Sequence, residues 1–198
     1  VYDWIDDLAV FPYDRDFLEN NHQRALSEAA IVASVAMPLH KQALKLRPDA
    51  LYLPNGVEFE AFAKRQEPEE PESHTDLRAL SPIVLADPEL DSFLREEKPI
   101  AGYYGALASW FDYDLLDTVA EQRPDWNFLL IGQSLDHSLG EHSLLNRPNI
   151  KWIGPREYRS LPAYLQLFEV AMIPFAINDI TLATSPLKLY EYMAGGSL

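Results

Sequence analysis

The sequence contains no cysteine among its 198 residues. This absence excludes disulfide bonds, thiolate catalysis and metal sites built from cysteine. No apolar run approaches the roughly 20 residues that a helix needs to cross a bilayer, and the first residues show no signal-peptide pattern. We therefore expect a cytoplasmic protein.

Positive charge is also scarce. The chain has 16 lysine and arginine residues against 31 aspartate and glutamate residues, which gives a formal net charge of −15 at pH 7. A surface of this kind repels nucleic acid and anionic lipid headgroups at long range, so we expect no nucleic-acid partner. A site for an anionic ligand must therefore gather its few cations at one place.

Apolar side chains are present in sufficient number for a core, because 47% of the residues are hydrophobic and 12% are aromatic. Strand-like and helix-like segments alternate, which is typical of βαβ units with parallel sheets. Strands are expected at residues 1–5, 29–35, 50–53, 99–104, 127–131, 150–153 and 169–173, and helices at residues 15–28, 37–46, 88–97, 112–122, 158–167 and 186–194. Residues 61–97 show no strand pattern and are expected to form a linker with a short helix between two domains.

Three of the predicted strands end at a glycine, namely Gly105, Gly132 and Gly154. Right-handed crossovers place the carboxyl ends of parallel strands on one edge of a sheet, and ligands of open α/β sheets bind at that edge. The start of the last helix, at Ser185, belongs to the same edge. The sequence therefore predicts a ligand site where these four segments meet.

The last predicted helix begins like a site for an anion. Ser185 suits the N-cap position and Pro186 the first helical position. Free N–H groups and the helix dipole favour an anion there, and Lys188 adds a full positive charge. Glu191 lies three residues later on the same face and can accept from two sugar hydroxyls. The same residues also fit an amphipathic helix with a local Lys188–Glu191 pair, so this segment alone leaves both interpretations open.

Side chains of the metal-ligating type occur together in one polar segment after the strand at 127–131, as Asp136, His137, Glu141 and His142. Their spacing fits no zinc motif, so we expect no metal site. The remaining histidines, His22, His40 and His74, are expected at the surface.

Four stretches, taken in order, resemble the GT-B glycosyltransferases, in particular the large retaining group 1 or family 4-like enzymes that include bacterial polysaccharide glycosyltransferases. They are residues 30–34 with 53–58, residues 103–107, residues 149–154 with Tyr158, and residues 185–195. The resemblance implies an α/β fold of the GT-B type with two Rossmann-like parallel-sheet domains, both incomplete in this chain. Residues 1–60 would end the N-terminal, acceptor-side domain, and residues 98–198 would form a truncated C-terminal donor domain.

The resemblance also implies a binding site for a nucleotide-diphosphate sugar, with no cofactor and no metal. Glu191 matches the family glutamate that binds the ribose hydroxyls, and backbone N–H groups near Leu187 and Lys188 would meet the diphosphate. Gly105 would allow the backbone to approach the phosphates. The other implied donor-binding residues are Ala106, Gly132, Tyr158 and Ser185. Asp6 and Asp7 fall where relatives carry a catalytic His-Asp pair.

Two departures from the family pattern concern the donor site. Ala183 stands where many relatives have a second glutamate, and the turn after Gly105 lacks the usual Arg and Lys. We hypothesise that Lys188 takes over part of that charge.

The resemblance implies transfer of a sugar with retention to a saccharide or lipid-linked acceptor. It admits association of the full-length protein with the inner face of the membrane. The alternatives are a nucleotide-sugar 2-epimerase of the same fold and a non-catalytic GT-B-like binding domain.

Overall fold

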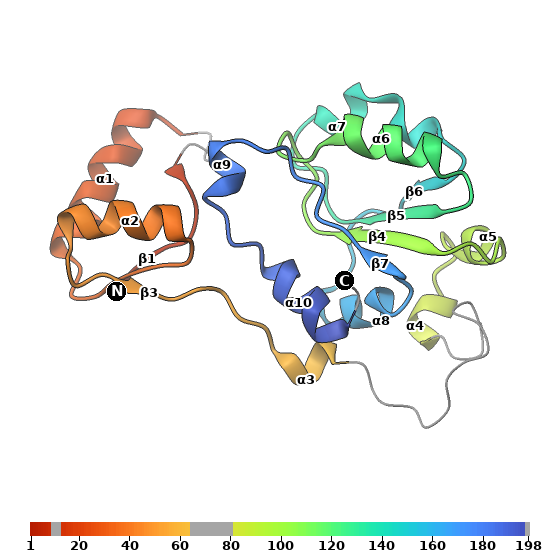
Figure 1. Ribbon diagram of the computed structural model, residues 1–198, viewed down its shortest axis with the longest axis horizontal. Helices are drawn as coiled ribbons and strands as arrows, with labels where there is room; N and C mark the ends of the chain where they lie inside the picture. Colours follow the sequence, from red (N-terminus) through yellow and green to blue (C-terminus); the bar gives the residue numbers. More distant parts are fainter. Residues whose placement is uncertain (9–12, 64–80, 197–198) are drawn as a thin grey trace. The chain divides into compact units, whose positions relative to one another are not determined.

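The computed structural model describes residues 1–8, 13–63 and 81–196 (Figure 1). These residues form two compact units, each with a parallel sheet. The first unit comprises Val1–Gly56 and Ile177–Leu187, and the second comprises Val57–Ala176 and Lys188–Leu198. The predicted α/β class with parallel sheets is confirmed.

The first unit contains a three-stranded parallel sheet in the order β1-β2-β3. Its register pairs Trp4 with Ser34, and Ser34 with Tyr52, at the carboxyl ends of the strands. Leu39 and Ala43 on one of its helices are fully buried, because the apolar positions of that helix share one face. Its elements are β1 (Tyr2–Trp4), α1 (Arg15–Glu28), β2 (Val32–Ser34), α2 (Met37–Leu46), β3 (Leu51–Tyr52) and α9 (Asp179–Leu182).

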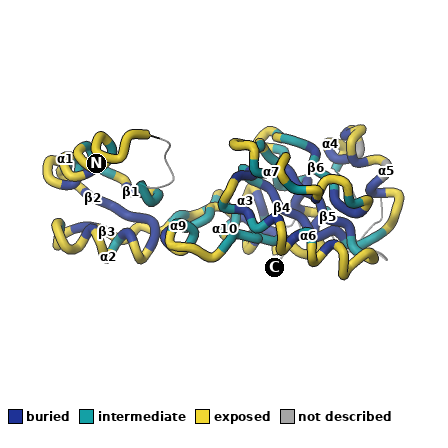
Figure 2. The backbone as a smooth tube through the Cα atoms, turned by 90° about the horizontal axis from the view of Figure 1, so that it is seen from above, coloured by how far each residue is buried: buried dark blue, intermediate teal, exposed yellow. Residues whose placement is uncertain are grey.

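The second unit contains a four-stranded parallel sheet in the order β6-β5-β4-β7. The two central strands, β4 and β5, are buried along their whole length (Figure 2). The strands are β4 (Ile100–Tyr104), β5 (Asn127–Ile131), β6 (Ile150–Trp152) and β7 (Val170–Ala171). The helices are α3 (Phe59–Phe62), α4 (Pro82–Leu85), α5 (Asp91–Leu94), α6 (Tyr113–Gln122), α7 (Ser138–Glu141), η3 (Ser143–Asn146), η4 (Tyr158–Ser160), α8 (Leu161–Leu165) and α10 (Leu187–Gly195).

Hydrophobic clusters cover both faces of this sheet, since neighbouring residues of a strand point to opposite faces. Tyr103 packs with residues of α6 and α7 on one face. Tyr104 packs with residues of α4, α5, α8 and α10 on the other. Figure 1 shows these two helical layers on either side of β4 and β5. The sheet is therefore covered on both sides, as parallel sheets require.

The segment Ile177–Leu187 belongs to the first unit, whereas the sequence analysis places it with the C-terminal domain. Two contacts within the unit account for this. Ala183 is 3% exposed and packs in the core of the first unit. The Asn55 side-chain amide donates to the Ser185 carbonyl at 2.6 Å.

Several expected elements differ in length. The helix expected at 158–167 is divided into η4 and α8, with Pro162 near the start of α8. The helix expected at 88–97 is the short α5, preceded by α4. α10 begins at Leu187, one residue later than predicted. Within the described residues, no helix combines the length and hydrophobicity that crossing a bilayer requires.

Candidate functional site

Three glycine turns meet at the carboxyl edge of the second sheet. Gly105, Gly132 and Gly154 have φ angles of 141°, 144° and 70°, which are values that side chains rarely allow. The Gly105 N–H donates to the Ile131 carbonyl and the Gly132 N–H to the Gly154 carbonyl, each at 2.8 Å. A Cβ at Gly132 would lie 1.9 Å from the Gly105 oxygen. The backbone of Gly105 is therefore too close to Gly132 for a side chain there, whereas at Gly105 and Gly154 the φ angle favours glycine.

Lys188 lies against the first of these turns. A Cβ at Gly105 would lie 2.6 Å from Lys188 Cε and 3.0 Å from Nζ. The Lys188 Nζ lies 5.3 Å from the centre of the Tyr103 ring and 5.0 Å from that of the Phe175 ring. Both distances are those of cation–π contacts. The lysine side chain is thus enclosed by glycine backbone on one side and aromatic faces on the others.

Burial lowers the pKa of Lys188 to about 8, although the nearby Glu191 charge acts to raise it. No ion pair joins Lys188 to Glu191 or to any other carboxylate that the structure describes. The local Lys188–Glu191 pair that the sequence allows is therefore not formed. A cation that is largely removed from water, with no carboxylate within ion-pair distance, favours a bound anion.

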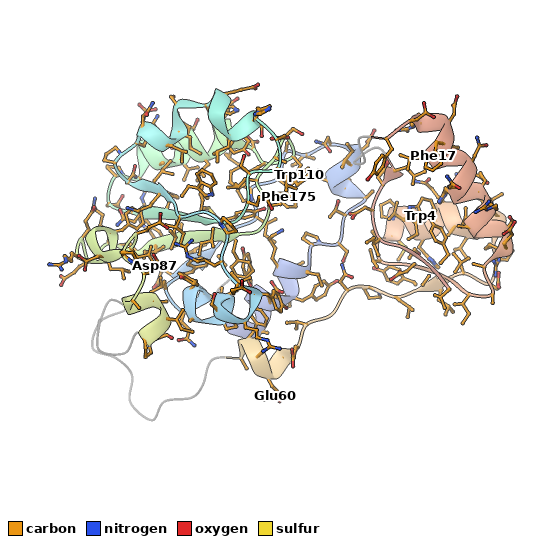
Figure 3. The ribbon with its side chains drawn as sticks, turned by 180° about the vertical axis from the view of Figure 1, so that it is seen from behind. Trp4, Phe17, Glu60, Asp87, Trp110 and Phe175 are labelled. Atoms are coloured by element: carbon orange, nitrogen blue, oxygen red, sulfur yellow. The ribbon has the colours of Figure 1, made fainter. Side chains whose placement is uncertain are left out.

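Phe175 is held in place by the loop that follows β7. It forms an antiparallel bridge with Phe111, and the next residue, Ala176, donates its N–H to the Trp110 carbonyl at 2.9 Å. Figure 3 shows the Phe175 side chain beside Trp110. The two rings that contact Lys188, those of Tyr103 and Phe175, thus belong to the packed second unit.

Glu191 is buried, with only 4% of its surface exposed. The Tyr158 hydroxyl donates to Glu191 Oε1 at 2.9 Å. Burial, and then the bond to Glu191, raises the pKa of Tyr158 to about 12. Burial and the Glu191 charge also raise the pKa of Tyr104, whose hydroxyl oxygen is buried without a hydrogen-bond partner. The carboxylate therefore lies among phenols, and Tyr158 is its hydrogen-bonded partner.

The loop after β4 is fixed by hydrogen bonds. The Tyr103 hydroxyl donates to the Ala106 carbonyl at 2.7 Å. Leu107 exchanges backbone hydrogen bonds with Gln133 and Leu135, each at 2.9 Å. The Ser109 N–H donates to Asp136 Oδ2 at 2.9 Å. Ala106 thus lies in a rigid segment next to the glycine turns.

Two of the side chains that could ligate a metal, Asp136 and His142, contact other protein groups instead. Asp136 accepts from the backbone of Ser109 and Ser138; burial alone would raise its pKa, but hydrogen bonds from Ser138 and Ser109 lower it. His142 Nδ1 lies 3.3 Å from Asp114 Oδ1, and its ring stacks on Tyr113. No group of three or more potential metal ligands occurs within the described ranges.

The remaining predicted site residues, Asp6, Asp7, Ser185 and Leu187, belong to the first unit. Burial raises the pKa of Asp6. The Asp6 carbonyl accepts from the Trp4 indole N–H at 2.9 Å. The structure thus brings six of the ten predicted residues together in the second unit, namely Gly105, Ala106, Gly132, Tyr158, Lys188 and Glu191.

The surface position expected for His22 is wrong, because α1 turns this residue inward. His22 is 6% exposed, its ring lies 4.2 Å from that of Trp4, and its Nδ1 lies 2.7 Å from the Tyr2 hydroxyl. Burial lowers the pKa of His22. His40 is half-buried, with Nδ1 3.1 Å from the Ser34 hydroxyl, and His74 lies outside the described residues.

Sequence reasoning missed the aromatic residues of the site, Tyr103, Tyr104 and Phe175. A signal was present, since two tyrosines directly precede the Gly105 turn. Phe175 could not be found in this way, because its contact with Lys188 depends on the path of the chain after β7.

No protein-family model matches the chain. The chain is 27% identical over 190 residues to TuaH of Bacillus subtilis (strain 168), which is provisionally assigned as a teichuronic acid biosynthesis glycosyltransferase. This match covers 93% of the chain and 43% of TuaH.

Two solved structures share the fold. HepE from Anabaena, in complex with UDP and glucose, has a TM-score of 0.68 at 16% identity, over 99% of this chain and 50% of HepE. Sucrose-phosphate synthase from Thermosynechococcus elongatus has a TM-score of 0.62 at 18% identity, over 94% of this chain and 43% of the synthase. The chain thus spans half the length of these proteins or less. The predicted GT-B type of the α/β fold is confirmed by these likenesses.

Proposed function

We propose that this chain is part of a glycosyltransferase that uses a nucleotide-diphosphate sugar and transfers the sugar, with retention, to a saccharide or lipid-linked acceptor. The observation that carries the proposal is Lys188, a half-buried cation beside the Gly105 turn with no carboxylate partner among the described residues. A diphosphate at this turn would supply the missing negative charge.

Glu191 is proposed to bind the ribose of the nucleotide. It lies one helical turn beyond Lys188 on α10, so the two side chains would meet neighbouring parts of one ligand. Its carboxylate can accept from both hydroxyls of a ribose. The likeness to TuaH, which is named as a glycosyltransferase, and the fold shared with a UDP complex support this assignment.

Transfer would depend mainly on stabilising the departing diphosphate. Lys188 and the backbone N–H groups at the start of α10, near Ser185 and Leu187, would stabilise the negative charge that develops on the leaving group. We propose that Gly105, Ala106 and Gly132 line the diphosphate end of the site, where Lys188 packs against the Gly105 turn. We propose Asp6 and Asp7 as the residues that act on the transferred sugar or the acceptor.

The alternatives receive no specific support. An epimerase would need acids and a histidine around the sugar, and the structure assembles no such group beside Lys188 in the residues it describes. Ala183, at the position of the second family glutamate, is buried in the core of the first unit. A non-catalytic binding domain would share the nucleotide site. An assay for turnover of a nucleotide sugar distinguishes it from a transferase.

The test is a thermal-shift series with UDP, GDP, ADP and TDP. A ligand present at about 100 times its Kd stabilises the native state by about 2.7 kcal/mol. We expect one nucleotide to raise the melting temperature, and Glu191→Ala and Lys188→Met each to abolish this shift. Lys151→Met, a substitution of another half-buried lysine in the same unit, serves as the matched control and should retain it. A cooperatively melting protein that no nucleotide stabilises would contradict the proposal.

A further inference from the structure

Access to Glu191 is blocked in the structure. A carboxylate that is 4% exposed cannot accept from a ligand unless a neighbouring group moves. Two of its neighbours, Tyr104 and Tyr192, are buried themselves, at 3% and 0% exposure. Tyr158 is 53% exposed and bonds directly to the carboxylate. Tyr158 is therefore an exposed residue that is bonded directly to the buried carboxylate.

The Tyr158 hydroxyl makes the same kind of contact that a sugar hydroxyl would make. It donates one O–H to Glu191 Oε1 at 2.9 Å. The Tyr104 phenol lies close to the same carboxylate, and burial together with the Glu191 charge raises the pKa of Tyr104. A carboxylate can accept several hydrogen bonds, so Glu191 holds one phenol where it could hold two ribose hydroxyls.

Within the described residues, the Tyr158 hydroxyl is hydrogen-bonded to Glu191 alone. It starts η4, a 3-10 helix of three residues whose N-cap residue, Glu157, makes no side-chain capping bond. Its ring also packs edge-on against Phe62, at 5.8 Å between ring centres. The ring therefore has an apolar contact that does not depend on the hydroxyl.

We propose that Tyr158 is a latch over Glu191, whose hydroxyl occupies the place of a ribose hydroxyl until a nucleotide displaces it. The proposal rests on the proposed function, because it takes Glu191 to be the ribose ligand. Binding of the nucleotide must then break the Tyr158–Glu191 hydrogen bond. The latch lowers the affinity for the donor and keeps the buried carboxylate satisfied when the site is empty.

The test compares the affinity for UDP of the wild type and of Tyr158→Phe by calorimetry. Phenylalanine retains the ring that packs on Phe62 and removes only the competing hydroxyl. A hydrogen bond to a charged group contributes about 1.5–3 kcal/mol, which corresponds to roughly 10- to 150-fold in Kd, so we expect Tyr158→Phe to bind UDP at least about tenfold more tightly. In the Glu191→Ala background, the same substitution should leave the affinity unchanged.

Tyr164→Phe is the matched control. The Tyr164 hydroxyl also donates to a carboxylate, Asp87 Oδ2 at 2.8 Å, and lies in the same unit. Its loss should not alter the affinity for UDP. A general loosening of the fold would affect both tyrosine variants, whereas the latch predicts tighter binding for Tyr158→Phe alone.

The failure of the latch and the failure of the proposed function are distinguishable. Unchanged or weaker binding by Tyr158→Phe, while Glu191→Ala still weakens binding, would overturn the latch and leave the ribose role of Glu191 intact. If the wild type and Tyr158→Phe bind none of UDP, GDP, ADP and TDP, or if Glu191→Ala has no effect on the nucleotide that binds, both proposals are overturned.

Discussion

Lys188 and Glu191 lie on one helix, yet their surroundings are opposite in character. Lys188 is enclosed by the rings of Tyr103 and Phe175 and has no counter-ion among the described residues. Glu191 is surrounded by phenols and accepts a hydrogen bond from Tyr158. The two charges thus form no ion pair with each other, and Lys188 has no carboxylate within ion-pair distance among the described residues. A nucleotide would supply a phosphate anion to Lys188 and hydroxyl donors to Glu191.

The affinity for UDP should weaken as the pH rises through about 8. Burial lowers the pKa of Lys188 to about 8 in the free protein, and a bound diphosphate favours the charged form and raises that pKa again. Well below this pKa the ammonium is already charged and affinity is constant. Above it, binding requires uptake of a proton, and Kd increases by up to about tenfold per pH unit.

Calorimetric titrations in buffers of different ionisation enthalpy measure this proton uptake directly. The phosphates of UDP do not interfere, because their last pKa is about 6. Lys188→Met should bind weakly with no dependence on pH above 7. An affinity of the wild type that stays constant through this range would contradict the role of Lys188.

Gly105→Ala should reduce both stability and nucleotide binding. The φ angle of 141° is strained for alanine, and the new Cβ would lie 2.6 Å from Lys188 Cε. We expect a loss of about 1–3 kcal/mol in the free energy of unfolding, measured with urea. Gly140→Ala is the control, because a Cβ there meets no atom within 4 Å. Equal effects of the two substitutions would show that the turn needs no glycine.

At the scale of elements, the alternation of strands and helices was predictable because hydrophobic periodicity and glycine turns are local signals. β5 has the bounds that the sequence predicts, and α1 and α2 do as well. The contacts of the site were harder to predict, since they join distant segments. Asn149 lies in one of the stretches that carry the family resemblance, but its amide lies 3.0–3.2 Å from the Ala120, Arg123 and Trp126 carbonyls and so caps the end of α6. The path of Ile177–Leu187 depends on tertiary packing.

The loop after β6 is anchored to the α4–α5 connection by a buried ion pair. Arg156 Nε lies 2.9 Å from Asp87 Oδ2, which also accepts from the Tyr164 hydroxyl at 2.8 Å. Burial would raise the pKa of Asp87, but the hydrogen bonds from Tyr164 and Arg156 lower it. This contribution to stability is present above the unfolded-state pKa and is lost as the pH falls through the folded-state value.

Asp87→Ala should therefore lower the free energy of unfolding by about 3 kcal/mol, because Arg156 and Tyr164 lose a shared buried acceptor. Urea denaturation measures the effect. Asp125→Ala removes the partner of Arg123 from an exposed pair, whose side chains are 49% and 62% exposed, and should change stability far less, because solvent screens such a pair. A loss for Asp87→Ala no larger than that of Asp125→Ala would contradict this account.

For the whole molecule, the chain consists of two α/β units with separate cores, and the proposed nucleotide ligands Lys188 and Glu191 both belong to the second. A net charge of −15 makes an anion site unfavourable over most of the surface, so a local arrangement must overcome it. In the described residues, Lys188 and the adjoining glycine turns provide this local site for an anion. In the proposed site, Lys188 binds the diphosphate of a nucleotide and Glu191 binds its ribose.

The most direct test is a calorimetric comparison of UDP and uridine with Lys188→Met and Glu191→Ala. The account predicts that Lys188→Met loses affinity for UDP, whereas its affinity for uridine, which has no phosphate, is unchanged. It predicts that Glu191→Ala loses affinity for both ligands. Lys188→Met with unchanged affinity for UDP, or Glu191→Ala with unchanged affinity for uridine, would contradict the proposed site.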